Sequence, residues 1–173
     1  MQRPNMVLRK SVTPIELRNI EHNLRDLDKW PMWNKFANRI LSEAHGKLMV
    51  NQRLDLHRVV AQQLIEDMWT ISEINEGRNP EFCQIIMNWQ GQTINGRTSA
   101  LAIKKLTLDI TILHSEDGGV EVAAWWEVTR LSRFLGFGNR MAGKIVTQVF
   151  DDLTNYGTID YKLENSNHAK QTE

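Results

Sequence analysis

The sequence predicts a mainly α-helical protein with a small β component. Three observations support this fold class. A helix start is recognisable at residues 13–16, apolar residues recur at spacings of three and four over much of residues 1–77, and glycines follow the apolar stretches. With 173 residues, of which 41% are apolar, the chain is long enough to bury a sizeable core.

The first predicted helix begins after Thr13. This residue supplies an N-cap hydroxyl, Pro14 occupies the first helical position and Glu16 the third, which together form a capping-box pattern. One apolar stripe follows, made of Leu17, Ile20, Leu24 and Leu27. We expect Trp30-Pro31 to end this helix, because a residue that precedes proline disfavours the helical conformation.

Two further helices are predicted in the N-terminal part. The second covers residues 32–45 and ends at Gly46, and the third covers residues 54–75 and ends at Gly77. The third has apolar residues at helical spacing, namely Val59, Val60, Leu64, Met68 and Ile71. Residues 1–77 are therefore predicted to form a helical region, with a possible role in dimerisation.

A change of character follows this helical region. Residues 78–97 contain a turn cluster at their start and the turn dipeptide Asn95-Gly96, which predicts a connecting segment or a small hairpin. At the C-terminal end, residues 165–173 are polar and are predicted to be a disordered tail.

Residues 98–129 fit two patterns. As a helix, they present Ile103, Leu106, Ile110 and Leu113 on one face. As strands, their apolar and polar residues alternate along both arms of a β-hairpin at 104–129. The order of elements downstream favours the helix. A short helix ends at Gly136, a longer amphipathic helix ends at Gly157, and residues 158–163 alternate like a half-buried strand.

This order resembles the winged helix-turn-helix family of DNA-binding domains. Residues 131–136 are similar to the end of that family's positioning helix and its turn, and residues 156–161 to the junction between recognition helix and wing. Upstream, residues 118–122 match its short strand, and residues 99–114 would be its first helix. The resemblance implies a winged-helix-like domain at 98–164 whose recognition helix, about 139–156, enters the major groove.

The resemblance also implies a function and a set of site residues. The chain would be a non-enzymatic regulator of transcription or of DNA replication initiation that binds double-stranded DNA as a homodimer. Phosphate contacts would come from the basic residues near the turn, namely Arg130, Arg133, Arg140 and Lys144. Base edges would be contacted by the amide and hydroxyl residues Asn139, Thr147 and Gln148.

A second hypothesis comes from the strand pattern. In it, the protein is an α+β interaction or assembly protein that does not bind nucleic acid, and residues 144–156 pack across the hairpin. A formal net charge of +0 and six tryptophans suit a protein interface better than a DNA-binding surface.

Other functional classes lack support in the sequence. No spacing of residues defines a catalytic site, a cofactor site or a metal site, so we expect neither an enzyme nor a metalloprotein. The single cysteine, Cys83, lies in an apolar run and is interpreted as a buried structural thiol. No apolar stretch is long enough to span a membrane and no secretory signal is visible, which predicts a cytoplasmic protein without a membrane partner.

Overall fold

The computed structural model describes residues 3–35, 39–40, 45–98, 102–115 and 117–159. Its helical elements are α1 (Pro14–Arg25), the 3-10 helix η1 (Leu27–Lys29), α2 (Trp30–Trp33), α3 (Arg130–Phe134) and α4 (Phe137–Tyr156). Its strands are β1 (Met6–Ser11), β2 (Arg39–Ile40), β3 (Arg53–Val60), β4 (Gln63–Arg78), β5 (Glu81–Ile94), β6 (Arg97–Thr98), β7 (Ile103–His114) and β8 (Gly119–Val128).

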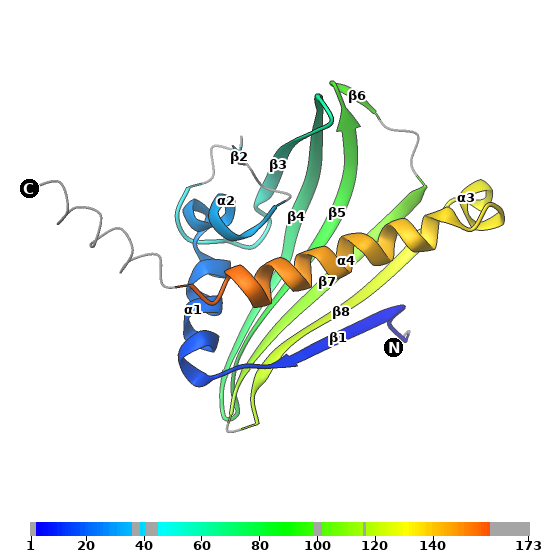
Figure 1. Cartoon of the computed structure of the whole chain (residues 1–173). Coiled ribbons are helices and arrows are strands. Elements are labelled where there is room, and N and C mark those ends of the chain that lie inside the picture. The colour runs from blue at the N-terminus through cyan, green and yellow to red at the C-terminus, as the bar shows by residue number, and fades with distance from the viewer. Residues whose placement is uncertain (1–2, 36–38, 41–44, 99–101, 116, 160–173) are drawn as a thin grey trace, which may run out of the picture.

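The strands form a single antiparallel sheet that curves around α4 (Figure 1). Their order is β1-β8-β7-β5-β4-β3-β2, and β6 pairs with β5. Strands β3, β4 and β5 follow one another as a meander, whereas β1 lies at the far edge and pairs with β8. The boundaries predicted near residues 77 and 98 fall inside β4 and β6, so segments on either side of them share this sheet.

The long helix α4 crosses the concave face of the sheet, and α1 and α2 close one end of the same layer (Figure 1). The side of α4 that faces the sheet is mainly apolar over three turns and carries the buried residues Ala142, Ile145, Val146, Val149, Phe150 and Leu153. Four of the six tryptophans, at 30, 33, 69 and 89, are buried in the core between these layers. Burial of this stripe is the main reason why α4 lies where it does.

Several local predictions are confirmed. Thr13 caps α1, its hydroxyl accepts a hydrogen bond from the Glu16 N–H, and the Glu16 carboxylate accepts one from the Thr13 N–H. The Asn95-Gly96 turn links β5 to β6. The two helices around Gly136 are present, and Gly157 caps the C-terminus of α4. The first helix ends earlier than predicted, at Arg25, and Trp30-Pro31 opens α2 instead of ending α1.

The predictions of a second and a third helix are wrong. Arg39–Ile40 pair with β3, within the range predicted as a helix at 32–45, and residues 41–44 lie outside the described residues. The range 54–75 forms β3 and most of β4, joined by a turn in which Ala61 and Gln62 have positive φ. This is a two-residue hairpin turn of the kind that Asn-Gly usually forms, so the sequence contained no recognisable break between the strands.

The mainly α fold class and the winged helix are also contradicted. Residues 103–114 and 119–128 are paired strands, as in the α+β alternative with a hairpin at 104–129, and not a first helix and a short strand. The predicted recognition helix exists as α4, but its apolar face is buried on the sheet. Thr158 and Ile159 are not in a strand, and the remainder of the predicted wing and the tail at 165–173 lie outside the described residues.

The capping box predicts the cost of losing the Thr13 hydroxyl. We expect Thr13→Ala to lower the free energy of unfolding by about 1 kcal/mol, because the first turn of α1 loses its side-chain acceptor. Thr13→Ser keeps that acceptor and should remain near the wild-type value. Urea denaturation followed by circular dichroism measures both, and equal stability of the three proteins would contradict the assignment.

Candidate functional site

The core contains a small enclosed cavity between α4 and the sheet. Its free volume is about 20 Å³, enough for about one water molecule. The lining is mostly apolar and includes Trp30, Trp33, Leu56, Trp69, Met87, Leu108, Ile110, Ile145 and Val149, with Asn34 and Asp67 as its polar members. The tryptophans and α4 therefore fill most of the space that the curved sheet encloses.

A larger groove lies beside this cavity and is open to solvent. It has a volume of about 440 Å³, within the usual range for small-molecule sites. The helix α4 contributes Phe137, Arg140, Met141, Lys144, Ile145 and Gln148, and the sheet contributes Arg58 and Gln92. Ile145 lines both the groove and the enclosed cavity, so the two spaces are neighbours.

A polar cluster separates the groove from the enclosed cavity. Gln92 Nε2 donates a hydrogen bond of 2.8 Å to Asp67 Oδ1, and Arg58 Nη2 lies 3.4 Å from Asp67 Oδ2. Asp67 is 4% exposed, and this burial raises the pKa of its carboxyl, while the bond from Gln92 acts in the opposite direction. Burial also lowers the pKa of the Arg58 guanidinium, partly offset by Asp67.

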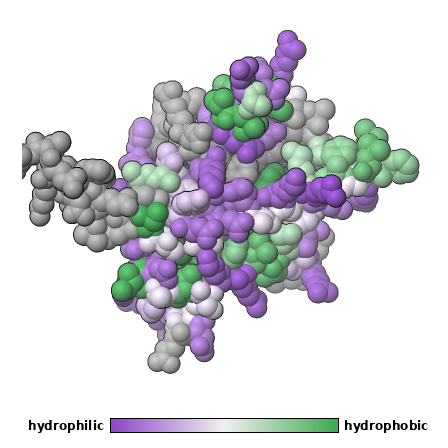
Figure 2. All heavy atoms as spheres, viewed as in Figure 1, coloured by the Kyte–Doolittle hydropathy of each residue, from purple (hydrophilic) through white to green (hydrophobic). Residues whose placement is uncertain are grey.

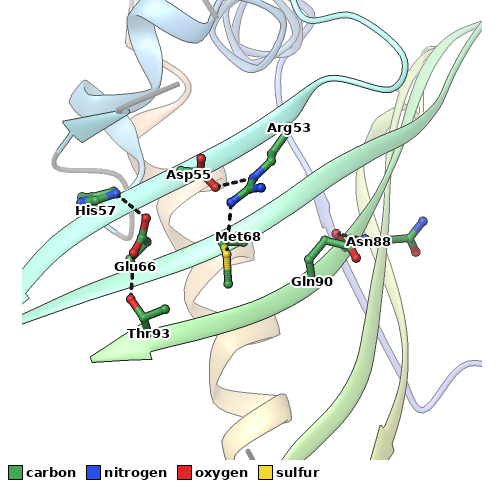
Figure 3. Close-up of polar contacts among 8 residues, drawn as sticks. All are labelled: Arg53, Asp55, His57, Glu66, Met68, Asn88, Gln90 and Thr93. Carbon is green, nitrogen blue, oxygen red and sulfur yellow. Dashed lines mark hydrogen bonds and ion pairs between the residues drawn. The ribbon is translucent and has the colours of Figure 1, made fainter. Parts of the chain in front are cut away.

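The register of β3, β4 and β5 puts this cluster on the inner face of the sheet. Leu56, Asp67 and Gln92 lie opposite one another on the three strands, and their neighbours His57, Glu66 and Thr93 point to the outer face. Figure 3 shows this outer row, in which Glu66 accepts a hydrogen bond of 2.8 Å from Thr93 and lies 3.2 Å from His57. Cross-strand contacts on both faces therefore hold the register.

The structure separates the seven residues that were predicted to bind DNA. Arg140, Lys144 and Gln148 come together along the groove, one helical turn apart. Arg130 and Arg133 are exposed on α3. Asn139 accepts a hydrogen bond of 3.0 Å from Trp126 Nε1, and Thr147 is exposed on α4.

Sequence reasoning missed the sheet residues of the site, Arg58, Asp67 and Gln92. They lie in ranges predicted as a helix or a connecting segment, so nothing in the sequence brought them together. The one available signal is that Asp67 and Gln92 interrupt otherwise apolar inward positions, such as Trp69 on β4. A second buried carboxylate, Asp152 on α4, accepts a hydrogen bond of 2.9 Å from the Lys35 N–H.

Within the part of the chain that the structure describes, no group of three or more His, Cys, Asp or Glu side chains is placed to hold a metal ion. Cys83 is buried in β5, as expected for a structural thiol, and burial raises the pKa of its thiol to about 11. No described helix combines the length and the apolar character needed to cross a membrane.

Comparisons with solved structures identify the fold. The chain is similar to Ara h 8.0201, with a TM-score of 0.60, 12% identity, and coverage of 88% of this chain and 94% of that one. It is similar to the hypothetical protein jhp0584 from Helicobacter pylori, with a TM-score of 0.58, 11% identity, and coverage of 87% and 86%. A START superfamily protein from Mycobacterium smegmatis matches with a TM-score of 0.53, 15% identity, and coverage of 86% and 94%.

The fold is therefore the START/Bet v1-like α+β fold. No family model and no curated protein matches the sequence. These findings overturn the resemblance to winged helix-turn-helix domains, and with it the roles in DNA binding, transcription regulation and DNA replication. The reason is topological: the predicted recognition helix, α4, packs its apolar face on the sheet, and the segment predicted as the first helix is strand β7. Of the two hypotheses, the α+β protein without nucleic-acid binding fits better.

The polar cluster predicts a large effect of Asp67→Ala. This change leaves Arg58 without its carboxylate and Gln92 without its acceptor in a buried setting, so we expect the free energy of unfolding to fall by about 3 kcal/mol. The matched control is Asp55→Ala, which removes the partner of the exposed Arg53 and should cost less than about 1 kcal/mol. Urea denaturation compares the two, and equal losses would show that the cluster has no special role.

The burial of Cys83 predicts slow thiol chemistry. We expect Ellman's reagent at pH 8 to react with the folded protein at least about a hundredfold more slowly than with the protein in urea, because the thiol is inaccessible and protonated. A rate in the folded protein close to that in urea would contradict the position of Cys83 in the core.

Proposed function

We propose that this protein is a non-enzymatic binding protein for a small amphipathic anion, which it holds in the groove between α4 and strands β3 and β5. The single observation that carries the proposal is the composition of the groove. One wall combines an apolar row with a row of cationic and amide side chains, and the opposite wall adds another cation.

The two rows follow from the helical repeat. Phe137, Met141 and Ile145 are four residues apart and therefore form one line along α4. Arg140, Lys144 and Gln148 repeat the same spacing one position earlier and form a neighbouring line, and all of these residues line the groove. A ligand with an apolar body and a charged head can therefore contact both rows at once.

The charge of the groove favours an anion. Arg140 and Lys144 have no ion-pair partner among the described side chains, and no carboxylate lines the groove itself. Across the groove lies Arg58, whose side chain is 20% exposed. Its ion-pair partner Asp67 also accepts a hydrogen bond from Gln92. Guanidinium and ammonium groups form strong charge-assisted hydrogen bonds with carboxylate or phosphate oxygens.

Binding without catalysis is supported by the same residues. Apart from the amine of Lys144, the side chains that line the groove include none of the usual nucleophiles and acid–base groups, namely thiol, hydroxyl, imidazole and carboxylate. Cys83 is buried in the sheet with a raised pKa. The groove thus offers contacts for recognition and for orientation of a ligand.

Isothermal titration calorimetry with decanoate and its neutral counterpart decan-1-ol tests this function. We expect wild-type protein to bind decanoate more tightly than decanol. The variant Arg140→Gln/Lys144→Gln should bind decanoate about tenfold more weakly, about 1.4 kcal/mol, and leave decanol unchanged, because only the charged head loses its partners.

The matched control is Arg78→Gln/Lys104→Gln, which removes the same two kinds of charge from exposed positions outside the groove. It should bind decanoate like the wild type. If both double variants lose affinity equally, only the overall charge matters, and if neither ligand binds, the proposed function is wrong.

The alternative of an interaction or assembly protein has one supporting observation, the exposed apolar side chains of α3. Light scattering coupled to size-exclusion chromatography tests self-assembly over a range of protein concentrations. A single monomeric mass throughout would count against it.

A further inference from the structure

The antiparallel pairing brings several strand ends and α3 to one end of the molecule. The β3–β4 turn at 61–62, the β5–β6 turn at 95–96, and the junction from β8 to α3 all lie there. Figure 1 shows these tips along one edge of the sheet, with α3 projecting from it. We call this end the tip face; the β4–β5 and β7–β8 turns lie at the opposite end.

The tip face exposes most of the large apolar side chains that are on the surface. Seven of the thirteen exposed large apolar residues in the described part of the chain belong to it: Val59, Val60, Leu64, Leu131, Phe134, Leu135 and Phe137. Phe134 is 88% exposed, so its side chain adds almost no hydrophobic stabilisation to the fold. Figure 2 shows apolar surface over α3 and near the tips of β3 and β4.

The apolar residues are accompanied mainly by positive charge, and the exposed Glu127 near the end of β8 pairs with Lys105. The segments 58–65, 94–98 and 128–150 contain six basic residues and no Asp or Glu: Arg58, Arg97, Arg130, Arg133, Arg140 and Lys144. The whole chain, in contrast, balances 21 basic against 21 acidic residues. Within α3, Arg130 and Arg133 alternate with Leu131 and Phe134, so cations flank the apolar side chains directly.

We propose that the tip face is a docking surface for a lipid bilayer that contains anionic phospholipids. Exposed aromatic and aliphatic side chains flanked by Arg can enter the interfacial region while the guanidinium groups remain among the headgroups. A second copy of this chain would place like charges opposite one another, whereas an anionic bilayer neutralises them. The charge complementarity therefore selects the bilayer as the partner.

A bilayer contact of this kind needs no membrane-spanning segment. The expectation of no membrane partner rested on the absence of a long apolar stretch. A protein that binds the bilayer surface does not need such a stretch. Arg58 and Phe137 line the groove and also belong to the tip face, so the groove opens next to the proposed contact. The docking proposal does not depend on the ligand proposed for the groove.

Co-sedimentation with sucrose-loaded vesicles tests the proposal with the full chain. We expect at least about tenfold stronger binding to vesicles with about one quarter phosphatidylserine than to pure phosphatidylcholine, and weaker binding at about 300 mM than at about 50 mM salt. Phe134→Ser/Leu135→Ser should reduce binding about tenfold, as should Arg130→Gln/Arg133→Gln. All four side chains are exposed, so these variants should fold.

The matched control is Ile15→Ser/Met49→Ser, which changes two exposed apolar residues away from the tip face and should bind vesicles like the wild type. Equal binding of wild type and the Phe134 variant overturns the proposal. The proposal is also overturned if the wild type binds neither vesicle type but forms a dimer, and the Phe134 variant does not form that dimer. Decanoate binding by the Phe134 variant should persist, which separates failure of the docking surface from failure of the groove.

Discussion

The packing of α4 against the concave face of the sheet is the interaction on which the rest of this structure depends. The buried stripe from Ala142 to Leu153 covers strands that would otherwise expose their apolar face to water. Because the sheet curves and the helix is straight, the two surfaces do not match along their whole length (Figure 1). The three tryptophans at 30, 33 and 69 fill much of the remaining space, and the unfilled part is the groove at the N-terminal half of α4.

The polar cluster of Arg58, Asp67 and Gln92 is a second important feature, and it depends on strand register. Asp67 and Gln92 face inward only because β4 and β5 pair as they do, and a slip by one residue would place Glu66 and Thr93 there instead. The hydrogen bond between Asp67 and Gln92 and the nearby Arg58 make the buried carboxylate tolerable. The same Arg58 then contributes to the wall of the groove, so a structural pair also shapes the candidate site.

Net charge is a poor guide to the surface of this protein. The balance of zero hides a groove whose charged lining residues are all cations and a mainly basic tip face, while acidic residues gather elsewhere, for example around Asp109 on the outer face of the sheet. Burial and the neighbouring acids Glu121 and Glu73 raise the pKa of Asp109. The groove and the tip face thus differ in charge from the outer face of the sheet around Asp109, and the inferences about ligand and partner rest on that difference.

Local signals in the sequence determined the features that depend on a few consecutive residues: the cap at Thr13, the turn at Asn95-Gly96, and the two helices around Gly136. Tertiary structure decided everything that depends on pairing between distant segments. Residues 103–113 are compatible with a helix or a strand, and only the sheet selects the strand, because it satisfies the backbone hydrogen bonds on both sides. Ala61 and Gln62 are not typical turn residues, so the local sequence does not predict the β3–β4 hairpin. Arg58, Asp67 and Gln92 meet across three strands, and the site exists only once those strands are paired.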